Sequence, residues 1–186
     1  AEIMMPFRNV SVKHLERLAA YDIELIAPSH GPLYADPHPI MDMYRQWVSG
    51  PPANKVVVPY VCMHGSTQVM VDRLTGALAQ KGVQVVPHKL SGGDTGRLAM
   101  ELVDAATLIL GTPTVLAGAH PQAAYAAILA NALRPRIMFA SIIGSFGWGG
   151  KTVEQLLSLV PNLKVEVLEP VILKGLPTEE ALAAVD

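Results

Sequence analysis

Residues 56–67 read VVVPYVCMHGST. The unbroken apolar run Val56–Val61 is typical of a strand that is buried on both faces of a sheet. The next segment, Gln68–Gln80, repeats apolar residues at helical spacing. A buried strand, a short loop and a helix form the repeating unit of parallel sheets. This stretch therefore predicts an α/β fold.

The same unit recurs to the end of the sequence. Further strands are predicted at Val83–Val86, Thr107–Leu110, Arg136–Ile143 and Lys164–Leu168, and further helices at Asp94–Asp104, Pro121–Leu133, Thr152–Leu159 and Thr178–Ala184. Five such units with right-handed crossovers predict a doubly wound, five-stranded parallel sheet of strand order 2-1-3-4-5.

A pair of prolines precedes this α/β domain. Pro51 and Pro52 resist helix formation and favour the extended geometry of a linker. We therefore expect an N-terminal part over residues 1–50, a linker over 51–55 and the α/β domain over 56–186.

The N-terminal part has few elements for a domain of its own. Ser11 is expected to cap a helix with apolar residues at helical spacing over Val12–Ala19. Ile23–Ala27 predicts a short strand, and Ile40–Val48 predicts a second helix. About fifty residues bury too little apolar surface to be stable alone. We expect this part to need a partner surface or further upstream sequence, and the whole chain to be a fragment.

Composition narrows the functional classes. Of the 186 residues, 51% are hydrophobic and 16% are charged, which indicates a chain that buries a large core. The net charge of −2 offers no general attraction for nucleic acid or an anionic membrane. Cys62 is the only cysteine, which excludes an internal disulfide and favours a reducing, cytoplasmic setting. The apolar stretches are too short for a membrane helix.

The loop after the first strand suits a phosphate. In an open parallel sheet, ligands bind outside the carboxyl ends of the strands. Cys62–Thr67 offers a Gly, two hydroxyl groups and the free backbone N–H groups of a helix N-terminus. It has neither a Lys nor an Arg, and no GxxxxGK[ST] pattern, so a phosphate monoester fits better than a triphosphate with Mg²⁺. The alternative is an ordinary helix start that is capped by Ser66 or Thr67.

Two more loops lie at the same predicted edge. Gly111–Thr114 follows the third strand and is stiffened by Pro113. Gly144–Gly150 follows the fourth strand and reads GSFGWGG. Its glycines allow the backbone to approach a flat ligand closely, and Phe146 and Trp148 offer aromatic faces for stacking. This composition favours a ligand site over a plain connection.

These loops together resemble the three FMN loops of flavodiiron proteins. The matching segments are MHGST at 63–67, GTPT at 111–114 and GSFGWGG at 144–150, and the GWGG run distinguishes them from short-chain flavodoxins. Upstream, IAPSHGP at 26–32 resembles the end of the family's metallo-β-lactamase-like domain. The resemblance covers essentially the whole chain. It implies a remnant of that domain over 1–50, followed by a flavodoxin-like FMN domain.

The resemblance also implies roles for individual residues. The implied FMN contacts are Met63, His64, Gly65, Ser66 and Thr67 on the phosphate, and Pro113, Thr114, Ser145, Phe146, Gly147 and Trp148 on the flavin. His30 matches the family's last histidine ligand to iron. No side chain is expected to act as a catalytic acid or base, because a flavin carries the redox chemistry itself.

Flavodiiron proteins are oxidoreductases that reduce oxygen to water or nitric oxide to nitrous oxide. The resemblance implies that FMN passes electrons from a rubredoxin-like protein or a flavin reductase to a diiron centre, within a head-to-tail homodimer. The family's other iron ligands lie in an upstream His-x-Glu-x-Asp segment, and nothing in this sequence resembles it. The chain alone is therefore not expected to reduce oxygen or nitric oxide. The missing ligands would lie on another chain, or would have been lost by cleavage or gene splitting.

Three other functions remain as alternatives. A stand-alone flavodoxin-like FMN carrier, or a quinone-reductase-like flavoprotein, shares the α/β domain but gives the N-terminal part no role. An α/β hydrolase would use Ser66 or Ser145, but neither lies in a Gly-x-Ser-x-Gly elbow. A receiver domain needs an aspartate at the end of the third strand, where this chain has Gly111.

Overall fold

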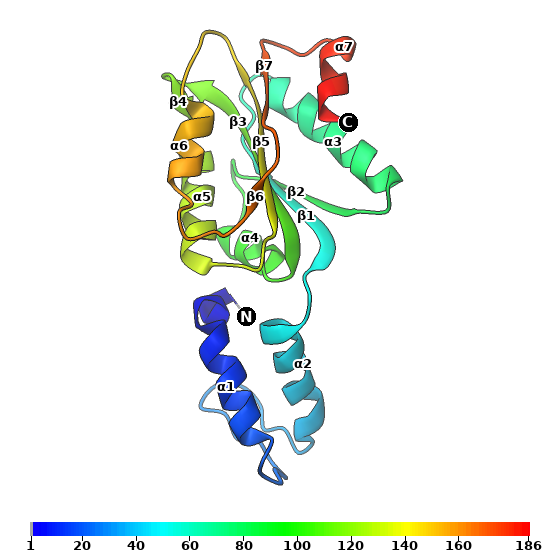
Figure 1. Ribbon diagram of the computed structural model, residues 1–186, viewed down its shortest axis with the longest axis vertical. Coiled ribbons are helices and arrows are strands. Elements are labelled where there is room, and N and C mark those ends of the chain that lie inside the picture. Colours follow the sequence, from blue (N-terminus) through cyan, green and yellow to red (C-terminus); the bar gives the residue numbers. More distant parts are fainter. Residues whose placement is uncertain (1) are drawn as a thin grey trace. The chain divides into compact units, whose positions relative to one another are not determined.

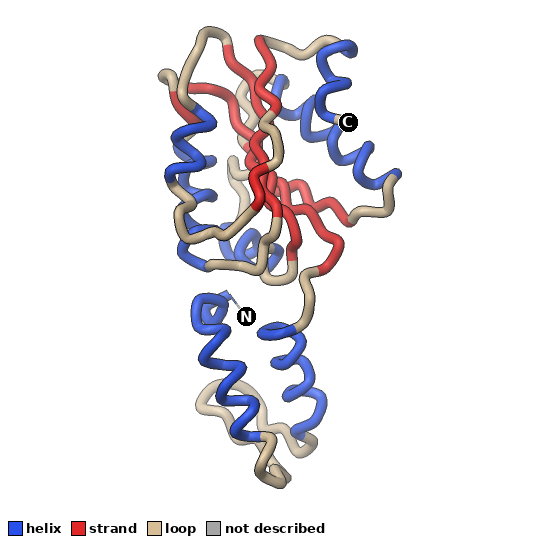
Figure 2. Tube along the Cα trace, in the orientation of Figure 1, coloured by secondary structure: helices blue, strands red, loops and turns tan. Residues whose placement is uncertain are grey.

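The computed structural model describes residues 2–186. The chain forms two compact units, Ile3–Pro51 and Pro52–Asp186, and the boundary between them falls at the proline pair. Figure 1 labels the helices and strands, and Figure 2 distinguishes them by colour.

The first unit is built around two helices. A 3-10 helix over Glu2–Phe7 leads into α1, Arg8–Leu18, which packs against α2, Pro37–Ser49. Helix α2 has a favourable start: Asp36 accepts a hydrogen bond from the backbone N–H of His38 at 3.1 Å, and proline occupies the first helical position.

Two predictions for this unit are wrong. Ser11 does not cap α1, because it lies inside the helix and its hydroxyl donates to the carbonyl oxygen of Phe7 at 3.3 Å. Ile23–Ala27 does not form a strand. A single antiparallel bridge joins Ile26 to Tyr34, because the proline-rich loop that follows provides no regular partner strand.

The second unit is a seven-stranded sheet with helices on both faces. Its strands are β1 (Ala53–Tyr60), β2 (Gln84–Lys89), β3 (Ala105–Val115), β4 (Gly118–Ala119), β5 (Phe139–Phe146), β6 (Glu166–Val167) and β7 (Val171–Lys174). The order is β2-β1-β3-β5-β6, with parallel pairing throughout. Strand β7 also pairs in parallel with β5, while β4 pairs antiparallel with β3.

The helices of this unit are α3 (Ser66–Gln80), α4 (Thr95–Glu101), α5 (Pro121–Leu133), α6 (Thr152–Ser158), α7 (Glu179–Leu182) and a final 3-10 helix, Ala183–Val185. Figure 1 shows α3 and α7 on one side of the sheet and α4, α5 and α6 on the other. The predicted doubly wound α/β class is confirmed.

The predicted strand order is matched approximately. The predicted fourth strand is β5, because the two-residue β4 was not foreseen. The predicted fifth strand, Lys164–Leu168, is shorter than expected: β6 keeps only Glu166–Val167, and β7 then runs beside the other end of β5. Pro170 separates the two pieces, and a proline has no N–H group for a strand ladder.

Two strands reach further toward the ligand edge than predicted. Gly111–Thr114, expected to be a loop, is part of β3, which continues to Val115. Gly144 and Ser145, also expected in a loop, belong to β5, which ends at Phe146. Paired strands, rather than free loops, therefore carry much of the predicted site.

Apolar clusters lie on both faces of the sheet. Val57 of β1 belongs to a cluster with Leu98 of α4 and Leu156 of α6. Its neighbour Val56 belongs to a second cluster with Met70 of α3. This explains the unbroken apolar run in β1, since alternate side chains point to opposite faces and both faces are covered. Among the described residues, no helix combines the length and the hydropathy of a membrane span.

A buried cation fixes the start of β1. Lys55 is 6% exposed, and its Nζ lies 2.7 Å from Glu101 and 2.9 Å from Asp104. Burial alone would lower the pKa of Lys55, but the hydrogen bonds and charges of the two carboxylates outweigh it and raise the pKa. These contacts tie β1 to α4 and to the turn that follows it.

The Lys55→Met variant is expected to lower the free energy of unfolding by about 2 kcal/mol near neutral pH, because two carboxylates lose their buried partner. The pKa of Lys55 is higher in the folded chain than in the unfolded chain. The stabilisation that protonated Lys55 gives the folded chain is therefore fully present below the unfolded pKa of about 10.4. It is lost as the pH rises through the pKa of Lys55 in the folded chain. Urea unfolding of both proteins at pH 7 and at about pH 11 measures the difference.

Arg97→Met is the matched control. Arg97 lies 3.9 Å from the same Glu101, but its side chain is mostly exposed, so a loss below about 0.5 kcal/mol is expected. Equal losses in the two variants would contradict a special role for the buried cation.

Candidate functional site

The carboxyl ends of β1, β3 and β5 meet at one edge of the sheet. Tyr60 of β1 lies opposite Gly111 of β3, and Gly111 lies opposite Ile143 of β5. The register continues from β3 to β5 until Pro113 lies opposite Ser145. The loops that follow β1 and β5 therefore start on either side of the end of β3.

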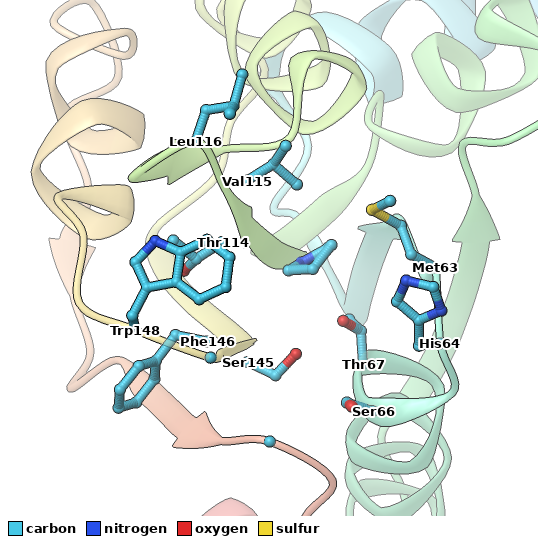
Figure 3. Close-up of a pocket in the computed structure, with 13 residues that line it drawn as sticks. Met63, His64, Ser66, Thr67, Thr114, Val115, Leu116, Ser145, Phe146 and Trp148 are labelled. Atoms are coloured by element: carbon cyan, nitrogen blue, oxygen red, sulfur yellow. The ribbon is translucent and has the colours of Figure 1, made fainter.

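A cavity of about 410 Å³ opens between these loops. All the sequence-predicted FMN contacts line it except Gly65, which lies between two lining residues (Figure 3). The residues that line it are Met63, His64, Ser66, Thr67, Pro113, Thr114, Val115, Leu116, Ser145, Phe146, Gly147, Trp148 and Gly175. Four segments that are far apart in the sequence thus surround one space.

One end of the cavity is a helix N-terminus with open backbone donors. Gly65 is the N-cap of α3, has a left-handed backbone with φ of 91°, and has no side chain to cap the helix. The first helical bond there runs from the N–H of Val69 to the carbonyl of Gly65. The N–H groups of the preceding first turn, including those of Ser66 and Thr67, therefore have no partner within the helix. The alternative of a helix start capped by Ser66 or Thr67 is wrong, since both residues lie inside α3.

Large apolar side chains surround the cavity without being buried. Met63 is 53% exposed, Trp148 is 76% exposed and Leu116 is 93% exposed. Figure 3 shows Met63 and Trp148 on opposite sides of the space between the loops. Exposed apolar groups gathered at one place mark an interaction site, because they gain from being covered.

Three lining residues were missed by the sequence analysis. Val115 and Leu116 belong to a tight hairpin in which β4 folds back on β3, and no Gly or Asn marked its turn. Gly175 follows β7, and its N–H donates to the carbonyl of Phe146 at 2.8 Å. The apolar run Val171–Leu173 before Lys174 and Gly175 was a detectable signal for another strand that ends at this edge.

The donor set fits a phosphate monoester joined to a planar ring. Backbone N–H groups and the hydroxyls of Ser66 and Thr67 occupy one end, and aromatic and apolar surfaces occupy the other. Among the described residues, His64 is the only ionisable side chain that lines this cavity. Space is also available, because Cβ atoms built on Gly65 and Gly147 would meet nothing within 4 Å.

His30 lies in the first unit, where it lines a separate hollow with apolar neighbours such as Ile26 and Tyr34. Its side chain is exposed. Among the described residues, no group of three or more His, Cys, Asp or Glu side chains is arranged to hold a metal ion. The assignment of His30 as an iron ligand therefore stays a prediction.

Known proteins support the resemblance drawn from the loops, although no family model matches the chain. The nitric oxide reductase of Moorella thermoacetica is 32% identical over 171 residues, which is 90% of this chain and 43% of that protein. The solved structure of rubredoxin oxygen:oxidoreductase from Desulfovibrio gigas superposes with a TM-score of 0.89 at 27% identity, over 97% of this chain and 46% of that one. The flavodiiron protein of Giardia intestinalis gives a TM-score of 0.86 at 23% identity, over 99% of this chain and 47% of that one.

The chain is a homologue of flavodiiron proteins. It spans less than half the length of each of these three relatives. The likeness to flavodiiron structures extends over both units, since the matches cover nearly the whole chain.

The cavity depends on the close approach of β3 and β5. A Cβ atom on Gly144 would overlap the carbonyl oxygen of Thr112, which belongs to the paired backbone. The Gly144→Ala variant is therefore expected to lower the free energy of unfolding by about 3 kcal/mol, because neither strand can move without breaking the ladder. Urea denaturation measures the loss.

Gly149→Ala is the control within the following loop, because a Cβ atom there would meet nothing within 4 Å. Its unfolding midpoint is expected to stay close to that of the unchanged protein. A Gly144→Ala variant as stable as Gly149→Ala would contradict the packing described for β3 and β5.

Proposed function

We propose that the second unit binds FMN and serves as the electron-transfer part of a flavodiiron-type oxidoreductase. The observation that carries this proposal is the single cavity that joins an uncapped helix N-terminus to exposed aromatic and apolar surfaces. When bound, FMN would supply the electron transfer, and the chain would supply binding and orientation.

Each end of the cavity has a separate task in this proposal. The backbone from Gly65 to Thr67, with the two hydroxyls, holds the phosphate. Pro113 and Thr114 on β3, together with the segment Ser145–Trp148, hold the flavin ring. Trp148 and Met63, which are 76% and 53% exposed, would cover ring surface that water would otherwise contact.

The remaining parts of the proposal come from the relatives. One solved relative is a rubredoxin oxygen:oxidoreductase, and another relative is a nitric oxide reductase. Oxygen or nitric oxide is therefore the proposed final electron acceptor. The proposed electron donor is a rubredoxin-type protein or a flavin reductase. A diiron centre would receive the electrons. His30 would provide one ligand, and residues outside this sequence would provide the others. We further propose a head-to-tail homodimer, a cytoplasmic location, and an origin of residues 1–50 in a metallo-β-lactamase-like domain.

Titration of the purified chain with FMN is the direct test. FMN fluorescence is expected to fall on binding and to saturate at one FMN per chain, because the ring comes into contact with aromatic and apolar groups. Riboflavin, which lacks the phosphate, is expected to bind at least about tenfold more weakly, since charge-assisted hydrogen bonds contribute about 1.5–3 kcal/mol each. A chain that takes up neither flavin would disprove the proposal.

The phosphate end can be tested separately with Ser66→Ala. Loss of this hydroxyl is expected to raise the dissociation constant for FMN about tenfold, and to leave riboflavin binding unchanged. Ser91→Ala serves as the control, because Ser91 donates to Gln122 at 3.2 Å and does not line the cavity. If Ser66→Ala weakened the binding of FMN and riboflavin equally, the phosphate would have to bind elsewhere.

A further inference from the structure

Helix α6 holds the hairpin that forms one wall of the cavity. The hydroxyls of Thr114, on the hairpin, and Thr152, on α6, are hydrogen-bonded at 2.9 Å. The side-chain oxygen of Gln155 accepts a hydrogen bond from the N–H of Ala119 at 2.8 Å. These hydrogen bonds hold the hairpin at Thr114, near the end of β3, and at Ala119, in β4.

A third hydrogen bond holds the turn itself. The N–H of Lys151, which precedes α6, donates to the carbonyl of Ala117 at 2.8 Å. The backbones can come this close because Gly150 has no side chain: a Cβ atom there would lie 2.8 Å from the carbonyl oxygen of Ala117 and 2.8 Å from the methyl group of Thr114.

The turn has an unfavourable backbone conformation. Leu116 has φ of 49° and Ala117 has φ of 64°, a left-handed region that residues other than Gly, Asn and Asp rarely adopt. A two-residue hairpin turn of this kind usually has Asn-Gly or another glycine-containing pair. Strained backbone of this sort persists only where the surrounding structure holds it in place. The contacts from α6 are in the right place to do so.

The side chain of Gln155 is exposed, but the backbone N–H that it binds belongs to a buried residue. Ala119 is only 7% exposed, so its N–H would lose its acceptor if the Gln155 side-chain oxygen were removed. Gln155 itself does not line the cavity, whereas Thr114, Val115 and Leu116 do. The side-chain contact through which Gln155 can act on a ligand is its hydrogen bond to the hairpin.

We infer that Gln155 is a positioning residue that locks the strained β3–β4 hairpin, so that the Thr114–Leu116 wall is preformed before the flavin enters. This inference rests on the proposed FMN function. A preformed wall raises affinity because binding does not have to order it.

Two substitutions at this position separate positioning from general packing. Gln155→Leu keeps similar bulk but removes the acceptor, and is expected to raise the dissociation constant for FMN about tenfold. Gln155→Glu keeps an acceptor oxygen at the same place, and its dissociation constant is expected to stay within about twofold of the unchanged protein. FMN titration of the three proteins, with circular dichroism to establish that each is folded, gives the comparison.

The outcomes are distinct. If the unchanged chain does not bind FMN, the proposed function fails and this inference fails with it. If the unchanged chain binds FMN and Gln155→Leu binds it equally tightly, the function stands and the positioning role of Gln155 is disproved. Weakening by Gln155→Glu as large as that by Gln155→Leu would also disprove it, since the acceptor would then not be the cause.

Hydrogen exchange on the unchanged protein tests the same inference without any variant. The amide of Ala119 is expected to be protected in the FMN-free chain nearly as strongly as with FMN bound. Rapid exchange that slows only after FMN is added would show that the ligand orders the hairpin, and would overturn the inference even if Gln155→Leu did not fold.

Discussion

The carboxyl ends of β1, β3 and β5 approach one another more closely than ordinary side chains would permit. Gly111 lies in the middle strand, where a Cβ atom would be 2.5 Å from that of Tyr60 in β1. Gly144 in β5 is packed against the carbonyl of Thr112 in β3. Everything at the ligand edge depends on this approach, because it sets the spacing of the loops that begin where these strands end. The cavity is thus a consequence of backbone packing.

Under the proposed FMN function, a site made in this way would recognise its ligand mainly by backbone groups and shape. The helix N-terminus at Gly65 provides N–H donors, while the opposite side provides apolar and aromatic surface from Met63 and Trp148. Over the part of the chain that the structure describes, no Lys or Arg side chain lines the cavity. A cationic Lys or Arg side chain therefore does not select the ligand. The partial positive charge of the helix N-terminus would do so, and it matches a single phosphate better than a polyphosphate. This agrees with the resemblance to flavodiiron proteins.

The sequence was informative wherever one local rule governed the structure. The apolar run Val56–Val61 indicated the sheet correctly, because burial on both faces requires apolar residues throughout a strand. The glycine-rich segment 144–150 contributes residues to the cavity at the carboxyl edge, and its role in binding a ligand stays a prediction. The hairpin turn at Leu116 and Ala117 has no comparable signal in the sequence. Its conformation depends on contacts with α6, which lies more than thirty residues further along the chain. Ser11 shows the same limit on a smaller scale, because its residue type suits a helix cap and the preceding residues simply continue the helix.

The energies at the hairpin explain why such long-range contacts decide its conformation. A left-handed backbone costs roughly 1–2 kcal/mol for each non-glycine residue, so Leu116 and Ala117 together cost about 2–4 kcal/mol. Each hydrogen bond to the region before or within α6 contributes about 0.5–1.5 kcal/mol net, and there are three of them, at Thr114, Ala117 and Ala119. The cost of the left-handed backbone and the gain from the three hydrogen bonds are similar in size. The turn therefore keeps its conformation only while α6 remains in contact with it. Glycine at the turn would remove the strain, but it would also free the backbone to take other conformations. A strained turn without glycine, held from one side, gives the cavity a wall with a single defined position.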